Sequence, residues 1–310
     1  MTTEKNPLIL VDGSSYLYRA YYVFSFFTNS LNEPTGAIYG MLNMLKNLLI
    51  QHKHCQIVIV FDTVGKTFRK KLFEKYKSNR PRMPDKLQQQ IKPLYNIIRA
   101  MGISLLEIKG VEADDIIGTL AVQAQKTGRT VLISTIDKDI AQLVTPNIML
   151  MNTRMNTILG PEEVRKKYGV PPSLIIDLLA MIGDKTDNIP GIPGVGQKTA
   201  ETLIKIFGNI HSIYNNLDKL NTVALRGIKT IISNFEKNRD LAFLSYKLAT
   251  IKTDIEIKLL DKQLIIQEPN IETLKALFKR YEFKHFLNEL NSGKWLQRKK
   301  NTHETKFTYF

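Results

Sequence analysis

The sequence predicts an α/β fold with a mostly parallel sheet flanked by helices, followed by an all-helical domain. Short apolar runs recur in the first half of the chain, and most of them lead to carboxylates. Stretches with helical spacing separate these runs, which is typical of buried parallel strands joined by helices. After Val170-Pro171-Pro172 only helical patterns continue. We therefore expect domains at residues 1–170 and 171–260, with a helical and basic extension at residues 261–310.

Composition narrows the class of partner. The 310 residues include 44 Lys and Arg against 29 Asp and Glu, giving a net charge of +15 and a pI of about 9.6. Such a basic chain indicates a polyanionic partner, either nucleic acid or an anionic membrane surface. A single cysteine excludes an intramolecular disulfide and a cysteine-rich zinc site. No apolar run approaches the roughly 18 residues of a membrane helix, and the polar N-terminus lacks a signal peptide's apolar core, so we expect a cytoplasmic protein.

Four predicted strands lead to acidic residues. They span residues 7–11, 57–61, 103–108 and 130–134. Because the carboxyl ends of parallel strands meet at one edge of a sheet, we expect the acids that follow them to lie close together. Helix capping explains one or two acids at a helix start, but three follow the third strand. We expect two of these three to share one helix face, and the two acids after the fourth strand to share one side of an extended segment. The acids are Asp12, Asp62, Glu112, Asp114, Asp115, Asp137 and Asp139.

Two segments combine basic and aromatic side chains. In residues 14–22, Tyr18 and Arg19 are candidates to stack a base and hold a phosphate, whereas Tyr16 and Tyr21 are expected to pack on the sheet. Residues 66–83 carry eight basic residues against one acidic residue. Such a run is usually a solvated surface, but its place after a strand of the acidic edge indicates a mobile, positively charged segment over the site. Its candidate nucleic-acid contacts are Arg69, Tyr76, Lys77 and Arg80.

Residues 183–200 join two further acids to a hairpin rich in glycine and proline. Asp184 and Asp187 are three residues apart and would share one side of a helical turn. Glycines in the hairpin allow positive φ and the close approach of another backbone. A helix that begins there aims free N–H groups at a phosphate, although a helix–turn–helix packed only for structure is the alternative. The candidate contacts are Gly191, Gly194, Gly196, Lys198 and Thr199.

The remaining predicted elements complete the fold. An edge strand is expected at residues 148–151, and a short helix is expected to open at residues 160–163. Further helices are expected at residues 35–50, 85–101, 173–181, 199–207, 210–215, 238–248, 271–280 and 285–291.

Nine carboxylates on one edge would repel each other strongly unless cations neutralise them. Oxygen ligands without His or Cys indicate Mg²⁺, with Mn²⁺ as the alternative, and not zinc. The number of acids exceeds the need of one ion, so we expect two ions, as in nucleases. Basic side chains would then face the scissile phosphate, and Tyr76 or Tyr18 would stack a displaced base. The expected catalytic residues are Lys77, Arg80, Asp115 and Asp139.

The motifs resemble those of a known nuclease family. The chain is similar to the 5′→3′ exonuclease region of bacterial DNA polymerase I, within the flap endonuclease superfamily, from about Leu8 to Gln297. The resemblance implies a PIN-like nuclease domain, a helical arch at about residues 66–94 and a helix–hairpin–helix-type module at residues 184–207. The matching motifs, in the same order, are Asp12-Gly13-Ser14-Ser15-Tyr16, Gly110-Val111-Glu112-Ala113-Asp114-Asp115, Asp137-Lys138-Asp139 and the stretch of residues 183–200.

The resemblance also implies an activity and its partners. The nine acids would be metal ligands, Tyr76, Lys77 and Arg80 would be arch residues, and Tyr18 would stack a base. The implied activity removes 5′ nucleotides and flaps from double-stranded DNA, including RNA primers, in replication and repair. Hairpins of the family also hold a monovalent cation such as K⁺ through backbone carbonyls. We expect a monomer, since no dimerisation signal is visible, and a separate DNA polymerase as functional partner.

Two departures from the family pattern stand out. Ile136 occupies a position where a glycine is expected, and its side chain beside the metal site is expected to slow turnover. The chain also stops where the polymerase would continue into its further domains. We expect a free-standing nuclease, with a fragment of a longer protein as the alternative.

Two other classes of function remain as alternatives. A non-catalytic DNA clamp would use the arch and hairpin but not the acids. A PIN-type endoribonuclease would use fewer acids and would not need the C-terminal hairpin. The presence of all nine carboxylates favours the DNA nuclease, because unused buried acids would only destabilise the fold.

Overall fold

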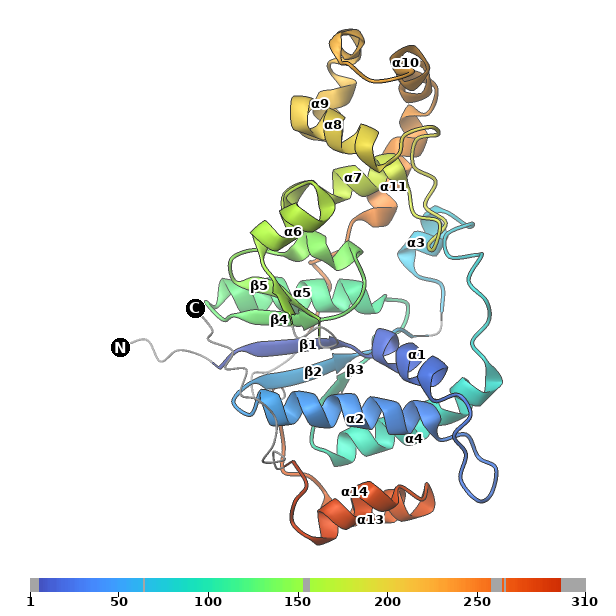
Figure 1. Ribbon diagram of the computed structural model, residues 1–310, viewed down its shortest axis with the longest axis vertical. Coiled ribbons are helices and arrows are strands. Elements are labelled where there is room, and N and C mark those ends of the chain that lie inside the picture. The colour runs from blue at the N-terminus through green and yellow to red at the C-terminus, as the bar shows by residue number, and fades with distance from the viewer. Residues whose placement is uncertain (1–5, 64, 153–156, 258–263, 265, 297–310) are drawn as a thin grey trace. The chain divides into compact units, whose positions relative to one another are not determined.

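A six-stranded sheet carries the acidic edge. In the computed structural model, which describes residues 6–63, 65–152, 157–257, 264 and 266–296, the strand order is β3-β2-β1-β4-β5-β6 (Figure 1). The strands β1 to β5 are parallel to one another, and only the pairing of β6 with β5 is antiparallel among the described strands. The strands are β1 (Leu8–Asp12), β2 (Gln56–Val60), β3 (Ser104–Leu106), β4 (Val131–Ser134), β5 (Ile148–Asn152) and β6 (Thr157–Leu159).

β1 lies at the centre of the parallel part of the sheet. It pairs with β2 on one side and β4 on the other, so that Leu10 faces both Val58 and Ile133. All five residues of β1 are buried, as expected for a strand covered on both faces. Because the chain leaves β1 toward β2 and later returns on the β4 side, the carboxyl end of β1 lies at a topological switch point, where α/β proteins bind ligands.

By their contacts, the residues form two compact units. The first comprises Met1–Ser15, Gln56–Met83 and Ser104–Ile266, and therefore contains the whole sheet. The second comprises Tyr16–Cys55, Pro84–Ile103 and Gln267–Phe310. α1 (Gly13–Val23) begins in the first unit and continues in the second. All nine predicted carboxylates belong to the first unit.

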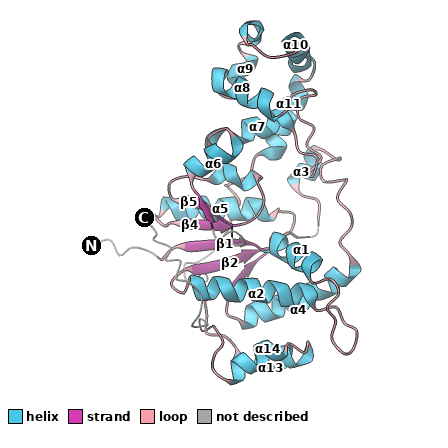
Figure 2. Cartoon of the chain, viewed as in Figure 1, coloured by secondary structure: helices cyan, strands magenta, loops and turns pink. Residues whose placement is uncertain are grey.

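Helices of the first unit connect the sheet to a helical region. α5 packs along β1 and β4, and α7 packs against α8 and α11. α6 begins where the Gly160 N–H donates to the Glu163 carboxylate (2.9 Å) and ends at Gly169, whose φ is 78°. The helices, cyan in Figure 2, are α3 (Phe68–Leu72), α5 (Ala113–Lys126), α6 (Pro161–Tyr168), α7 (Ile175–Ile182), α8 (Gln197–Phe207), α9 (Ile210–Tyr214), α10 (Ile228–Lys237) and α11 (Arg239–Ala249).

The second unit is helical. Its helices besides α1 are α2 (Gly36–Gln51), α4 (Asp85–Ala100), α13 (Ile271–Arg280) and α14 (Lys284–Asn291). α2 lacks a side-chain cap of its own, and Gln90 of α4 accepts from the N–H groups of Ala37 (2.8 Å) and Ile38 (3.2 Å) instead. Lys46 of α2 pairs with Glu289 of α14, which ties the C-terminal helices to α2. No helix among the described residues is long and apolar enough to cross a membrane.

The sequence prediction misses two elements. β5 is not an edge strand, because β6 pairs with it on the outer side. α10 was not predicted and lies before α11. Two local conformations also differ from the prediction. Asp139 begins a short 3₁₀ helix (Asp139–Leu143) and not an extended segment, and the Asp184–Asp187 stretch is a turn and not a helix.

Candidate active site

The ends of β1 and β2 hold the first two acids of the site. Asp12 closes β1, where its oxygens accept from the Ser15 N–H (2.9 Å), the Ser15 hydroxyl and the Thr135 hydroxyl (2.8 Å). Asp62 follows β2 and accepts from the N–H of Ala113 (2.9 Å), so it caps α5 from a neighbouring strand. The strand ends and the start of α5 are therefore joined at one edge of the sheet, as the sequence predicts.

Glu112 precedes α5 and is the most heavily contacted acid. Its Oε1 accepts from the Thr67 hydroxyl (2.8 Å). Its Oε2 accepts from Lys77 Nζ (2.9 Å) and the Tyr76 hydroxyl (3.0 Å), and Arg69 Nη1 lies 3.3 Å away. Four cationic or hydroxyl-bearing side chains from the basic segment thus converge on one carboxylate.

Asp137 and Asp139 follow β4. The Asp137 carboxylate accepts from the N–H of Asp139 (2.9 Å), which starts the 3₁₀ helix at that residue. Asp139 is buried, and its Oδ1 has no hydrogen-bond partner among the described residues. An unpartnered buried carboxylate oxygen is costly, which marks it as a place for a cation.

Asp184 and Asp187 are brought into the same region by a closed turn. Backbone bonds between Asp184 and Ile189 (2.9 and 2.8 Å) close this turn, which follows α7. Gly183 has a φ of 72°, and a Cβ there would lie 2.5 Å from the carbonyl oxygen of Ile189, so only glycine fits. A cavity of about 290 Å³ is lined by Arg80, Ile136, Asp137, Lys138, Asp139, Asp184, Thr186 and Asp187.

The electrostatics divide the acids into two groups. Burial raises the pKa of Asp12, and it raises the pKa of Asp139 to about 7 with a further contribution from the nearby Asp137 charge. Burial and the charges of Asp137 and Asp12 raise the pKa of Asp114 well above its usual value. Burial also raises the pKa of Asp137. Burial is the main cause of all four raised pKa values, and the Asp137 charge adds to it at Asp114 and Asp139, so these carboxylates favour neutralisation.

The second group is already neutralised by side-chain cations. Burial opposes ionisation of Glu112, but the charges of Lys77 and Arg69 outweigh it and hold the pKa of this carboxyl below its usual value. For Asp184, the hydrogen bond from Lys138 (2.8 Å) likewise outweighs burial and lowers the pKa. Arg80 pairs with Asp187. Within the described residues, no three Asp, Glu, His or Cys side chains already form a complete metal site. The unpartnered oxygen of Asp139 and the raised pKa values nevertheless fit hard divalent cations.

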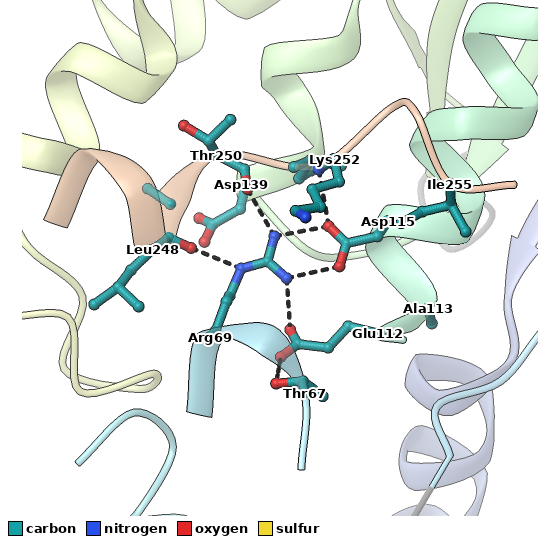
Figure 3. A network of polar contacts seen from close by, with 12 residues as sticks. Thr67, Arg69, Glu112, Ala113, Asp115, Asp139, Leu248, Thr250, Lys252 and Ile255 are labelled. Carbon is teal, nitrogen blue, oxygen red and sulfur yellow. Dashed lines mark hydrogen bonds and ion pairs between the residues drawn. The ribbon is translucent and has the colours of Figure 1, made fainter. Parts of the chain in front are cut away.

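Asp115 and Arg69 occupy positions that the sequence does not predict. Figure 3 shows the guanidinium of Arg69 on both oxygens of Asp115 (2.8 Å each). The N–H of Lys252 also donates to Asp115 (2.9 Å), and this carboxylate is fully buried. Arg69 is 2% exposed. In this arrangement both oxygens of Asp115 accept from Arg69 and the guanidinium is enclosed, so the metal contact of Asp115 and the DNA contact of Arg69 stay predictions.

The basic segment contacts the acids of the site through side chains and backbone. Tyr76 is 3% exposed, and its hydroxyl lies near Glu112 and Asp187 (3.0 and 3.3 Å). In this arrangement the Tyr76 hydroxyl contacts the acids, and its stacking on a base stays a prediction. Lys77, with a φ of 53°, donates its backbone N–H to the carbonyl of Asp187 (2.9 Å). Within the predicted arch of residues 66–94, α3 covers only Phe68–Leu72, turns follow it, and α4 begins at Asp85.

The hairpin before α8 presents part of its predicted surface. Gly191 is buried, and its N–H donates to the Ser245 hydroxyl (3.0 Å), so its prediction as a DNA contact is corrected. Gly194, Gly196 and Lys198 are exposed, and Thr199 is half-buried. α8 has no side-chain cap at Gly196, which leaves its first N–H groups available.

The remaining residues that the sequence singles out are Tyr16, Tyr18, Arg19 and Ile136. Tyr18 and Arg19 belong to the part of α1 in the second unit, where Tyr18 stacks on Tyr22 (6.5 Å) and Arg19 lies over Tyr16 (5.2 Å). Tyr16 is buried, as the sequence predicts. Ile136 is 63% exposed at the cavity of the acids.

Sequence reasoning missed several supporting residues. Asn188 has a φ of 56°, and its side chain donates to the carbonyl of Lys75 (2.7 Å). The only signal was its residue type, because Asn tolerates positive φ. Thr135 and Ser245 carry no signal at all, since a hydroxyl that meets a distant group cannot be distinguished from a solvated one in sequence.

Comparison with known families decides the assignment. Residues 7–169 match the model of the 5′-3′ exonuclease N-terminal resolvase-like domain. Residues 170–272 match the model of the 5′-3′ exonuclease C-terminal SAM fold. The chain belongs to the 5′-3′ exonuclease family. This confirms the enzyme class predicted from the acidic motifs, and the protein is a nuclease.

Individual relatives agree with the family. The nuclease is 48% identical over 289 residues to a protein named 5′-3′ exonuclease from Buchnera aphidicola subsp. Baizongia pistaciae, covering 93% of this chain and 96% of that one. It is 50% identical over 285 residues to DNA polymerase I of Pseudomonas aeruginosa, covering 92% of this chain but only 31% of the polymerase.

Solved structures share the fold. A structure described as T5 5′-exonuclease with bound divalent metal ions (zinc) matches with a TM-score of 0.68 at 19% identity, covering 93% of this chain and 99% of that one. The catalytic core of Rad2 in complex with DNA substrate matches with a TM-score of 0.63 at 17% identity, covering 96% and 93%. These likenesses confirm the predicted fold, a PIN-like α/β domain followed by a helical domain.

Proposed function

We propose that this nuclease hydrolyses double-stranded DNA from 5′ ends and at 5′ flaps with the help of two divalent cations. One observation carries the proposal. Buried and half-buried carboxylates with raised pKa values gather at the carboxyl edge of the sheet, and one oxygen of the buried Asp139 lacks a partner among the described residues. Mg²⁺, or Mn²⁺, suits such an all-oxygen site. The residues that would hold the ions are Asp12, Asp62, Glu112, Asp114, Asp137, Asp139, Asp184 and Asp187.

The chain's own residues would divide the work of the reaction. The divalent pair would supply Lewis-acid stabilisation of the charge that develops on the phosphoryl oxygens. Lys77 and Arg80 now neutralise Glu112 and Asp187. Once cations take over that task, these two side chains are free to bind the scissile phosphate beside the same acids. Desolvation by Tyr76 and the buried acids would keep bulk water from weakening these contacts.

The proposed substrate follows from charge and from the hairpin. A net charge of +15 favours a polyanion. The exposed glycines before α8, with Lys198, offer backbone N–H groups and a cation to a duplex phosphate, and the hairpin carbonyls are candidate ligands for K⁺. Solved structures of similar fold contain DNA, in the T5 flap endonuclease and in Rad2. We extend this to 5′ ends left by replication and repair, including RNA primers, with the protein acting as a monomer beside a DNA polymerase.

The test uses four end-labelled substrates, with and without Mg²⁺. These are a 5′-flap duplex, a nicked duplex, a DNA single strand and an RNA single strand. The proposal expects cleavage of the first two only when Mg²⁺ is present, and slow or no cleavage of the single strands. Lys77→Ala should lower the single-turnover rate by about 100-fold, the scale of one lost electrostatic donor, while duplex binding changes little.

The two alternatives give different results in the same test. A clamp would bind the duplexes without cleaving them in any metal. An endoribonuclease would cleave the RNA strand in preference to the flap. Either result would refute the proposal, and binding measured in parallel by fluorescence anisotropy separates the two.

A further inference from the structure

A buried network of hydrogen bonds surrounds Arg69. A guanidinium has five N–H donors in a fixed plane, and a buried one needs a partner for each. Arg69 Nε donates to the carbonyl of Leu248 (2.8 Å), and Nη2 donates to the carbonyl of Thr250 (2.7 Å) as well as to Asp115. Nη1 reaches Asp115 and Glu112. Every donor direction is used, so this site is built around arginine.

The network joins three parts of the first unit. Arg69 comes from α3 in the basic segment, Asp115 lies in the first turn of α5, and Leu248 and Thr250 lie at the C-terminal end of α11 (Figure 3). The carbonyls at a helix end lack intrahelical partners, and a cation is favoured there. Arg69 therefore satisfies the end of α11 and the carboxylate of α5 at the same time.

Asp115 is committed to this network. One of its oxygens also accepts from the N–H of Lys252, and the chain after α11 continues along α5, where Thr119 contacts the backbone at Lys252 and Ile255. The result is that Asp115 neutralises and orients the guanidinium. The guanidinium in turn lies 3.3 Å from Glu112, an acid of the proposed metal site.

The structure assigns Arg69 the part of a positioning residue, which holds Glu112 in place for the metal ions while Asp115 serves as its counter-ion and not as a metal ligand. This inference rests on the proposed function. The proposed function concerns residues that would bind the ions or the phosphate. The inference instead names two residues, Arg69 and Asp115, that would act only through Glu112. Their loss should weaken metal binding before any substrate is present, because groups that orient a ligand typically account for about 10- to 100-fold in metal affinity or activity.

The helix α11 also contacts the hairpin before α8. Ser245, one turn before the end of α11, accepts from the N–H of Gly191 in the hairpin. The same helix thus contacts the hairpin through its middle and Arg69 through its end. Glu112 and the hairpin are therefore placed by one shared element.

The first experiment measures Mn²⁺ binding without DNA, by electron paramagnetic resonance of the free ion. Arg69→Ala is expected to lower Mn²⁺ affinity by about 10- to 100-fold. Guanidinium ion, added at non-denaturing concentration, should restore it by entering the vacated site. Lys71→Ala, which removes an exposed cation from the same helix, is the matched control and should bind Mn²⁺ like the wild type. Unchanged affinity in a folded Arg69→Ala protein would overturn the inference.

A double-mutant cycle tests the part of Asp115. If this carboxylate acts through Arg69, Asp115→Asn should lower Mn²⁺ affinity in the wild type but add little to Arg69→Ala. A full further loss in the double variant would show that Asp115 binds the ion directly, and would overturn that part of the assignment. The wild type serves as the separate check on the proposed function. If the wild type binds Mn²⁺ but cleaves no duplex, the proposed function fails. The inference about metal binding is then still decided by the Mn²⁺ affinities of the variants.

Loss of one member of a buried ion pair often prevents folding. Two further variants keep the inference testable in that case. Arg69→Lys preserves the charge but cannot supply the five planar donors, and should fold with weakened Mn²⁺ binding. The apolar pair Arg69→Met with Asp115→Leu removes both charges together, which proteins tolerate better than a single loss. A folded apolar pair with wild-type Mn²⁺ affinity would contradict the inference.

Discussion

At the scale of single residues, Asp139 connects the stability of the protein to its chemistry. It is buried near Asp137, and one of its oxygens has no partner. Asp139→Asn keeps the shape of the side chain and removes the charge. We expect the variant to melt at a higher temperature than the wild type in the absence of divalent cations, because a buried repulsion is relieved. Calorimetry in the presence of a chelator measures this difference.

The same variant should lose cleavage. Loss of a group that only orients a metal ligand typically lowers activity by about 10- to 100-fold. The cleavage rate of Asp139→Asn should fall by more than this. Asp177→Asn is the matched control, because Asp177 is also buried but accepts from the N–H of Ile210 away from the acids, and an Asn can make the same bond. Equal loss of activity in both variants would argue against a special part for Asp139.

The raised pKa values predict how stability depends on pH. The pKa of Asp139 is about 7 in the folded protein and near 3.8 in the unfolded chain. Between these values the folded state binds more protons, so stability without divalent cations should fall as the pH rises through this window. Mg²⁺ should restore stability at about pH 8 and change little at about pH 5. The urea midpoint of unfolding is measured for the wild type and for Asp139→Asn over this pH range, and the difference between the two isolates the contribution of Asp139. A difference that does not vary with pH would contradict the prediction.

Single residues also show which features of the site the sequence can predict and which it cannot. Acids after parallel strands were predictable, because strand direction alone brings Asp12, Asp62 and Asp137 to one edge. What each acid faces was not predictable. Arg69 and Lys77 look alike in a basic run, yet one is buried on Asp115 and the other lies near Glu112 with a positive φ. Only the packing of α3 against α5 and α11 decides between them.

At the scale of elements, two turns hold each other in place. The segment of residues 75–80 meets the turn of residues 185–188 through the Lys77 N–H to Asp187 carbonyl bond and through the side chain of Asn188. Both Lys77 and Asn188 have positive φ, a conformation that costs most non-glycine residues about 1 kcal/mol or more. This strain is maintained by contacts on both sides, which favours a functional reason for it.

Substitutions at Asn188 separate its backbone from its side chain. Asn188→Gly keeps the positive φ without strain but deletes the bond to Lys75, and Asn188→Ala adds strain to the same loss. We expect the Gly variant to be less stable by about 1 kcal/mol, the usual cost of one hydrogen bond, and the Ala variant by about 2 kcal/mol. Trypsin should cut after Lys75 and Lys77 faster in both variants, since the segment is released.

Cleavage of the flap substrate should fall together with this release, because Lys77 loses its fixed place beside the acids. Glu74→Ala, at an exposed position beside the same segment, controls for a general loosening of the loop. If trypsin cuts the Asn188 variants and the wild type at equal rates, the two turns do not hold each other.

Elements with strong patterns were predictable and short ones were not. The apolar runs of β1, β2 and β4 and the periodic helices α2, α4 and α8 were predicted close to their observed bounds. β6 has three residues and none of them is buried, so it shows no apolar run. α10 begins after Gly227, whose φ is 74°, and its apolar residues Ile228, Ile231, Ile232 and Phe235 have helical spacing, so this helix was predictable although it was not predicted. For β6, pairing with β5 and not the local sequence stabilises the strand.

At the scale of the whole molecule, the net charge of +15 sets the expected salt dependence of DNA binding. The logarithm of the binding constant should fall steeply and linearly with the logarithm of salt concentration. Lys198→Ala, at the exposed start of α8, should reduce that slope by about 1 if its ammonium meets a phosphate. Lys205→Ala, at the other end of the same helix, should leave the slope unchanged. Equal slopes for all three proteins would remove α8 from the interface.

The ion pairs of Lys77, Arg80 and Lys138 have a practical consequence. The protein carries its own provisional counter-charges, which cover Glu112, Asp187 and Asp184 without any added ion. A chelated preparation should therefore keep its shape during storage and can be loaded onto DNA while inert. A rapid pulse of magnesium would then start every molecule at the same moment, so that the events before bond cleavage become accessible to time-resolved recording.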